Sequence, residues 1–300
     1  MNSPSLTALP LAAPLGWVGR QALAGLSYFG GLAGLLASTA RSAFRPAEEP
    51  LRRSVSAQLA WMLALGAPLV ALVHVGLGSF LSMQSYFGGT FVEGTGAVVG
   101  VGLLRNMAPL MASLTLAGLV AARVTPELRA ARRTSTAPGD DRPGFLERTA
   151  AGVRPPAPPV PRPTGQRAVA ARVLAAALAG PLLSLWGALV GTAVGLEVSQ
   201  TLLGISSHTF FQMFWEMIWV RDVVGVLVKG LAFGLFAGLF ACHEGLSPSG
   251  GDDLGAVSSA ACRAACFAGV AILAVNSGWF ILVYHAGPAF GPTLLAPATP

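Results

Sequence analysis

Residues Val173–Val194 have the sequence VLAAALAGPLLSLWGALVGTAV, which contains no charged side chain. An α-helix needs about 20 mainly apolar residues to cross the hydrocarbon core of a bilayer, so this segment is long enough for one crossing. Four further segments have the same character: Leu59–Leu81, Val98–Val120, Val223–Cys242 and Ala264–Tyr284. We therefore predict an all-α membrane protein with about five transmembrane helices.

The composition excludes an ordinary soluble protein. Only 11% of the residues are charged, whereas a typical soluble domain has about a quarter charged residues. The net charge of +6 could indicate a nucleic-acid partner, but Lys229 is the only lysine and most arginines flank the apolar segments. This distribution favours the lipid bilayer, and no nucleic acid, as the partner of the basic residues.

The positions of the basic residues also predict the orientation of the helices. Five arginines precede the first span, ten lie between Arg123 and Arg172, and Arg263 precedes the fifth span. Only Arg221 lies in the connections on the opposite side. Because cytoplasmic connections are enriched in basic residues, we place the N-terminus inside the cell and the C-terminus outside.

Two apolar segments are predicted to lie at the membrane surface. Thr201–Val220 ends in a cluster of aromatic residues, which is typical of a segment that caps the outer face. Leu15–Phe44 has a polar face and an opposite apolar face on a helix, which favours an amphipathic helix in the inner interface over a sixth span. The polar face contains Arg20, Ser27, Ser38, Arg41 and Arg45, and the apolar face contains Val18, Ala22, Phe29 and Leu36.

The segment Thr134–Gln166 has a different composition, with eight prolines and few large apolar residues. Such a segment cannot build a core, so we predict a disordered cytoplasmic insertion. Together with the spans, this predicts five parts: residues 1–56 with the interfacial helix, 57–125 with two spans, the insertion 126–167, 168–286 with three spans, and the tail 287–300.

Glycines spaced by four residues predict close helix packing. Each set lines one face of a helix, where it lets another backbone approach closely. The spacing leaves open whether the neighbouring helix belongs to the same chain or to a second copy. The two sets are Gly187, Gly191 and Gly195, and Gly230, Gly234 and Gly238.

Two cationic residues lie within the predicted spans, where a charge is costly and is usually functional. Arg105 and Lys229 both follow the outer end of their span by a few residues, at a similar depth. They could together receive a phosphate headgroup. Alternatively, Arg105 pairs with Glu93 and Lys229 with Asp222, or both side chains extend toward the interface.

Other chemistry has little support in the sequence. The chain has no P-loop, no nucleophile elbow and no zinc-binding histidine pair, so we predict that it is not an enzyme. Cys242, Cys262 and Cys266 are too few to indicate a disulfide framework. We predict no metal site and no cofactor.

Several motifs occur in an order and spacing that resemble the MlaE (YrbE) permease family. The family's "LQxY" and "LxRELGP" segments resemble Met83–Tyr86 and Leu103–Pro109, and its "AGRxGxAxxAEIG" segment resembles Ala117–Glu127. Its "D…GLIKSxxFG" segment is similar to Arg221–Gly234, and "CYxGY…GGAxGVGxATTxAVV" is similar to Cys242–Ala260. The chain departs from the family pattern at two places. Asn106 stands where the family has Glu, and the residues after Glu127 differ from the family segment that docks a separate ATPase.

The resemblance implies the permease subunit of an ABC-type transporter in the bacterial inner membrane. It implies a homodimer that works with a separate ATPase and with a periplasmic lipid-binding MCE-domain protein, and that moves phospholipid or a related lipid. The matching positions nearest the implied lipid path are Tyr86, Arg105, Pro109, Asp222 and Lys229.

Glu127 and Glu244 are the residues expected to contact the ATPase. The alternative function is a membrane scaffold that does not transport and that recruits partners through its proline-rich loop.

Overall fold

The structure is a computed structural model that describes residues 12–44, 49–87, 96–136, 165–247 and 253–285. Every element in these ranges is helical, which confirms the predicted all-α class. The helices are α1 (Ala12–Phe44), α2 (Glu49–Phe87), α3 (Ala108–Thr136), α5 (Gln166–Leu203), α6 (Ser207–Met217), α7 (Val220–Leu246) and α8 (Leu254–Phe280). Three π-helical segments accompany them, namely η3 (Ala97–Val101), η4 (Leu103–Met107) and η5 (Ile281–His285).

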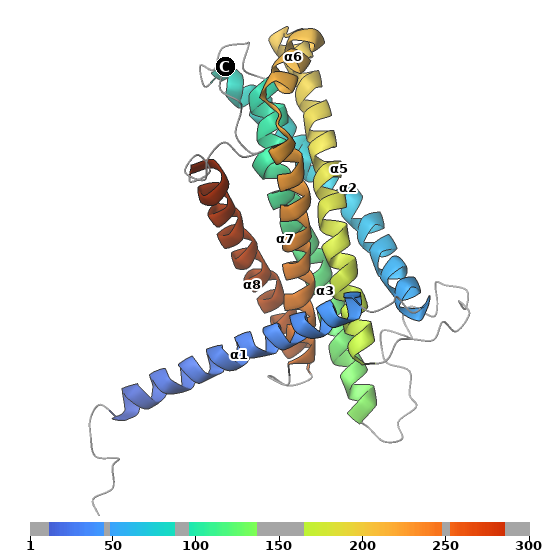
Figure 1. Ribbon diagram of the computed structural model, residues 1–300, viewed down its shortest axis with the longest axis vertical. Coiled ribbons are helices and arrows are strands. Elements are labelled where there is room, and N and C mark those ends of the chain that lie inside the picture. Colours follow the sequence, from blue (N-terminus) through green and yellow to red (C-terminus); the bar gives the residue numbers. More distant parts are fainter. Residues whose placement is uncertain (1–11, 45–48, 88–95, 137–164, 248–252, 286–300) are drawn as a thin grey trace, which may run out of the picture.

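α5 lies at the centre of the bundle. It packs along α2 and along α7, and it also contacts α3 (Figure 1). The largest core cluster joins these four helices through residues such as Met62 of α2, Val120 of α3, Val173 of α5 and Leu239 of α7. The apolar stretch Val173–Val194 therefore has protein neighbours on several sides, while α8 is mostly uncovered. Many of the uncovered side chains are large and apolar, as a lipid solvent requires.

The glycine faces make their contacts within this chain. A Cβ atom on Gly180 would lie 1.9 Å from the carbonyl oxygen of Gly230, and one on Gly234 would lie 2.2 Å from that of Ala176. On the α2 side, a Cβ atom on Gly78 would lie 2.2 Å from the carbonyl oxygen of Gly191. These backbones touch because no side chain separates them. The structure thus assigns the predicted close packing to α5 with α7 and α5 with α2.

α1 crosses one end of the bundle at a steep angle to α5 and α7 (Figure 1). It is held there by Tyr28, whose ring centroid lies 4.4 Å from that of His243 and 5.5 Å from that of Phe267. Leu32 and Leu35 add contacts to the main core cluster. The face of α1 that contacts the bundle lies between the predicted polar and apolar faces. Residues of both predicted faces are exposed, namely Arg20, Arg41, Val18, Phe29 and Leu36.

This arrangement supports an interfacial α1. Six helices are long and apolar enough to cross a membrane, and residues 16–44 of α1 are among them. A helix that lies across the end of the bundle cannot cross the bilayer that α5 and α7 span. The five remaining candidates are α2, the run from η3 through α3, α5, α7 and α8. We call the two ends of the bundle the α1 end and the α6 end.

α6 covers the opposite end of the bundle, as predicted for the aromatic segment (Figure 1). α5 stops at Gly204, which has a left-handed backbone with φ of 68°. Ser206 then caps α6, and its hydroxyl accepts a hydrogen bond from the backbone N–H of Thr209 at 3.2 Å. Phe210 is buried and its backbone rests against Gly96, so α6 packs on the start of the second span.

The described helices extend beyond the predicted spans at the α1 end. α2 starts at Glu49 and α3 continues to Thr136, so the first part of the predicted insertion 126–167 is helical. The extension of α3 is fixed by two arginines that donate to carbonyls at the end of α7. Arg129 Nε lies 3.4 Å from the carbonyl oxygen of Glu244, and Arg132 Nη1 lies 3.0 Å from that of Leu246. The rest of the insertion, residues 137–164, lies outside the described residues, as do Arg45 and the tail 287–300.

The close approach of α5 and α7 predicts that Gly234→Ala destabilises the protein. The added methyl group would meet the carbonyl oxygen of Ala176 at 2.2 Å, so one backbone must move. We expect a loss of about 1–3 kcal/mol, measured as a lower midpoint of thermal unfolding in mild detergent. Gly118→Ala on α3 is the control, because a methyl group added there would meet nothing within 4 Å. An equal midpoint for the two variants would contradict the assigned packing.

Candidate functional site

The first turn of α7 places a carboxylate near the α6 end of the bundle. Asp222 is the third residue of α7, and its Oδ2 accepts a hydrogen bond from the backbone N–H of Trp219 at 3.0 Å. This is the backbone half of a capping box, and the N-terminus of a helix also favours a negative charge. This local hydrogen bond therefore fixes the position of the Asp222 carboxylate at the start of α7.

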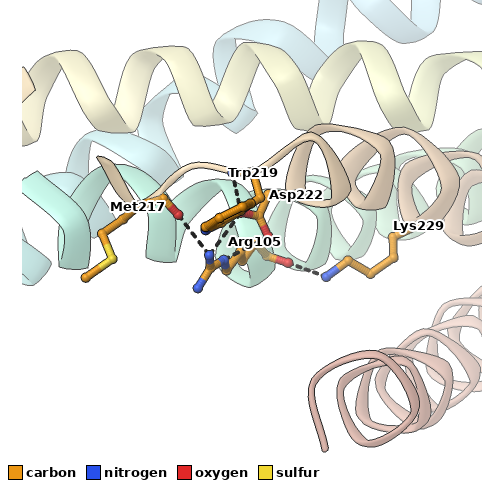
Figure 2. A network of polar contacts seen from close by, with 5 residues as sticks. All are labelled: Arg105, Met217, Trp219, Asp222 and Lys229. Carbon is orange, nitrogen blue, oxygen red and sulfur yellow. Dashed lines mark hydrogen bonds and ion pairs between the residues drawn. The ribbon is translucent and has the colours of Figure 1, made fainter. Parts of the chain in front are cut away.

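Arg105 forms a bidentate ion pair with Asp222 (Figure 2). Its Nε lies 2.8 Å from Oδ1 and its Nη2 lies 3.0 Å from Oδ2 of the carboxylate. The same Nη2 donates to the backbone carbonyl of Met217 at 3.0 Å. The Asp222 side chain is completely buried, whereas 27% of the Arg105 side chain is exposed. Of the pairings predicted from the sequence, Asp222 is thus the partner of Arg105 and not of Lys229, while Glu93 lies outside the described residues.

The ammonium group of Lys229 donates to the backbone carbonyl of Arg105 (Figure 2). In an α-helix this carbonyl would accept from the amide of residue 109, but Pro109 has no amide hydrogen. The chain is also π-helical from Leu103 to Met107, a geometry that often occurs at functional sites. Pro109 therefore leaves a carbonyl that Lys229 can reach, and the structure brings Arg105, Pro109 and Lys229 to the same level of the bundle.

Two asparagines complete the cluster. Asn276 of α8 accepts from Lys229 Nζ through Oδ1 at 3.5 Å, and its Nδ2 donates to Oδ1 of Asn106 at 2.7 Å. Sequence analysis did not single out Asn276 as a site residue, and it treated Asn106 only as a departure from a family pattern. The available signal was a lone amide within an apolar span, since polar side chains inside membranes usually bond across helices.

The cluster brings two cationic groups and one carboxylate together. Lys229 is 2% exposed and Asp222 is 1% exposed, so both charges lie in the protein interior. Arg105 is partly exposed at the same place, and its guanidinium group uses Nε and Nη2 to bind Asp222 and the carbonyl of Met217. The site is built by η4, α7 and α8, which meet only after the bundle has folded.

Tyr86 is not connected to this cluster by the described contacts. It lies in the last turn of α2, and its side chain is outside the described residues. Its role in a lipid path stays a prediction.

The two acidic residues expected to contact an ATPase lie near the α1 end and differ in accessibility. Glu244 is nearly buried, and its Oε2 lies 3.0 Å from Nη2 of Arg263 on α8. Glu127 is partly exposed and forms ion pairs with Arg123 at 2.8 Å and with Arg172 at 3.3 Å. Glu127 is therefore the more accessible of the two, and a direct contact of either residue with an ATPase stays a prediction.

We expect Asp222→Asn to destabilise the protein, because the change leaves the Arg105 guanidinium without its bidentate partner. Breaking a buried ion pair from one side typically costs about 3–5 kcal/mol. The double variant Asp222→Asn/Arg105→Gln should recover part of that loss, which a thermal-unfolding cycle in detergent measures. Glu49→Gln serves as the control because the Glu49–Arg53 pair is exposed, so its loss should cost less than about 1 kcal/mol. Additive effects in the cycle would show that the ion pair contributes nothing.

Comparison with known proteins finds a family similarity in the second half of the chain. Residues 163–281 match the family model described as Permease MlaE. No curated protein matches the chain at a significant level. The match includes Asp222, Lys229, Glu244 and Asn276, and it begins after the segment that contains Arg105 and Pro109. The match covers two of the motifs, Arg221–Gly234 and Cys242–Ala260, and in residues 163–281 the chain is therefore similar to the MlaE permease family.

Proposed function

We propose that this permease subunit moves a phospholipid or a related lipid across or out of the inner membrane, with energy from a separate ATPase. The observation that carries the proposal is the Arg105–Asp222–Lys229 cluster, which holds two cationic groups in helices that span the membrane. Charges at such depth are costly and are usually retained for function.

The surroundings of the cluster suit a lipid. Large apolar side chains are exposed along the helices that carry it, among them Val224, Leu227 and Leu231 of α7 and Leu273 and Phe280 of α8. A lipid could place its acyl chains against these apolar residues and its phosphate near Arg105 and Lys229. The partly exposed guanidinium would meet the phosphate first, because Lys229 lies deeper and is almost completely buried.

We further propose alternating access around a lipid cavity between two copies of the bundle. α7 supports this mechanism because it carries Asp222 and Lys229 near one end and Glu244 near the other. A partner that moves the α1 end of α7 could thereby change the geometry at the α6 end. The proposed partners are a second copy of the chain, an ABC ATPase at the α1 end and a periplasmic MCE-domain protein at the α6 end.

Photolabelling tests the lipid site. The purified chain is reconstituted into vesicles that contain a phospholipid with a photoreactive group next to its phosphate, and the labelled peptides are identified by mass spectrometry. We expect labelling of η4 and of the first half of α7, and about a tenfold loss of label in the double variant Arg105→Gln/Lys229→Gln. Arg52→Gln, an exposed arginine in α2, is the control and should keep the label. Unchanged labelling of the double variant would show that these cations do not receive the headgroup.

Co-purification tests the energy source. We expect an ATPase with a P-loop to be retained with the tagged chain when native membranes are solubilised in mild detergent. Glu127→Arg should reduce the retained amount, because Glu127 is the accessible acidic residue at the α1 end and its charge would be reversed. Exposed Glu49 on α2 allows the matched control Glu49→Arg, which should retain the partner. Absence of an ATPase from the wild-type complex would contradict the proposal.

A further inference from the structure

The charges of the cluster do not balance among the described residues. Arg105 and Asp222 neutralise each other, and both oxygens of the carboxylate are occupied. Oδ1 accepts from Arg105 Nε, while Oδ2 accepts from Arg105 Nη2 and from the backbone N–H of Trp219. The ammonium of Lys229 is the remaining charge, so the described cluster carries a net charge of +1.

The hydrogen-bond acceptors that Lys229 meets in the described part of the chain are neutral. Its ammonium donates to the backbone carbonyl of Arg105 and lies 3.5 Å from Oδ1 of Asn276. The amide of Asn276 is held in this orientation by Asn106, since Nδ2 of Asn276 donates to Oδ1 of Asn106 at 2.7 Å. Asn276 thus supplies one neutral acceptor to Lys229, and Asn106 orients that acceptor, at a position where an aspartate would also supply a negative charge.

This difference affects which headgroup the site would stabilise. The Asp222 carboxylate acts on Lys229 through space, but it is already neutralised by Arg105, so one positive charge remains in the interior. A buried net charge is costly, and a bound anion would lower that cost. A zwitterionic headgroup brings its own ammonium group, which would repel Lys229 and would find both Asp222 oxygens already hydrogen-bonded. A headgroup with net negative charge brings the missing charge and no competing cation.

We propose that Asn106 and Asn276 are specificity-determining residues that make the site select lipids whose headgroup carries a net negative charge. The inference rests on the proposed function, because it concerns the same lipid site. The chemical class is a phosphate diester without an amine, as in phosphatidylglycerol, in preference to a zwitterionic diester such as phosphatidylethanolamine.

The test measures the lipids that remain bound to the protein. The full chain is purified from vesicles of equimolar phosphatidylglycerol and phosphatidylethanolamine with matched acyl chains, and the bound lipids are counted by native mass spectrometry. We expect the wild type to be enriched in phosphatidylglycerol. Asn276→Asp should lower the enrichment about tenfold, because a carboxylate would then lie beside the Lys229 ammonium.

Matched variants separate this effect from a general change in charge. Ser258→Asp adds the same charge at an exposed position near the start of α8, at the end of the span away from Lys229, and should keep the enrichment. Asn106→Asp is the second test variant, in case Asn276→Asp does not fold, and should lower the enrichment in the same direction.

The outcomes distinguish the two proposals. A wild-type protein that retains neither lipid contradicts the proposed function itself. A wild type that retains both lipids equally overturns only the selectivity, as does an aspartate variant that folds and keeps the wild-type ratio. If neither aspartate variant folds, the test uses the ratio of phosphatidylglycerol to phosphatidylethanolamine bound to the wild type and to Lys229→Gln. Enrichment in the wild type that disappears in Lys229→Gln supports the inference, and equal ratios overturn it.

Discussion

Hydrocarbon offers no hydrogen bonds, so the polar groups that these helices carry into the bilayer must find partners inside the protein. Several described side chains meet this constraint by bonding across helix boundaries, while Ser113 Oγ and His74 Nε2 are buried without a partner in the described part of the chain. Ser82 of α2 donates to the carbonyl of Gly195 in α5 at 2.8 Å, and Thr125 of α3 donates to that of Ala241 in α7 at 3.1 Å. Lys229 does the same with Arg105, using a carbonyl that Pro109 leaves without its helical donor. These hydrogen bonds therefore hold the helices together, and one of them forms part of the candidate site.

Close packing makes those cross-helix bonds reachable. Gly180 and Gly230 bring the backbones of α5 and α7 into contact, and this places α7 deep in the bundle. As a result Asp222 and Lys229 lie on the buried face of α7, toward η4 and α8. Bulkier residues at the glycine positions would separate the helices and move the Lys229 ammonium away from the carbonyl of Arg105. The position of the Lys229 ammonium therefore depends on the close glycine packing of α5 against α7.

α7 connects two polar clusters with different exposures. Toward the α6 end it carries Lys229 and Asp222, which pairs with Arg105 of η4, and near the α1 end it carries Glu244, which pairs with Arg263. Between them α7 is apolar and packs against α3, α5 and α8. One continuous helix, packed on three sides, thus joins the two clusters. The ring contacts of Tyr28 with His243 and Phe267 attach α1 at the same place as the second cluster.

Sequence alone determined the class of the protein, because long uncharged runs such as Val173–Val194 have few stable alternatives to a helix in lipid. Periodicity also predicted the amphipathic character of α1 and the glycine faces, and the aromatic cluster predicted the capping segment α6. Arg105 and Lys229 were conspicuous as charges within apolar spans, and Asp222 was expected as a partner of Lys229 and from the family resemblance. Sequence alone left open their pairing, the helices that the glycines face, and the part taken by Asn276. Those answers depend on contacts between positions such as 105 and 222 or 106 and 276. Only the packed bundle brings such distant positions together, because local periodicity fixes the face of a helix but not the neighbour that the face meets.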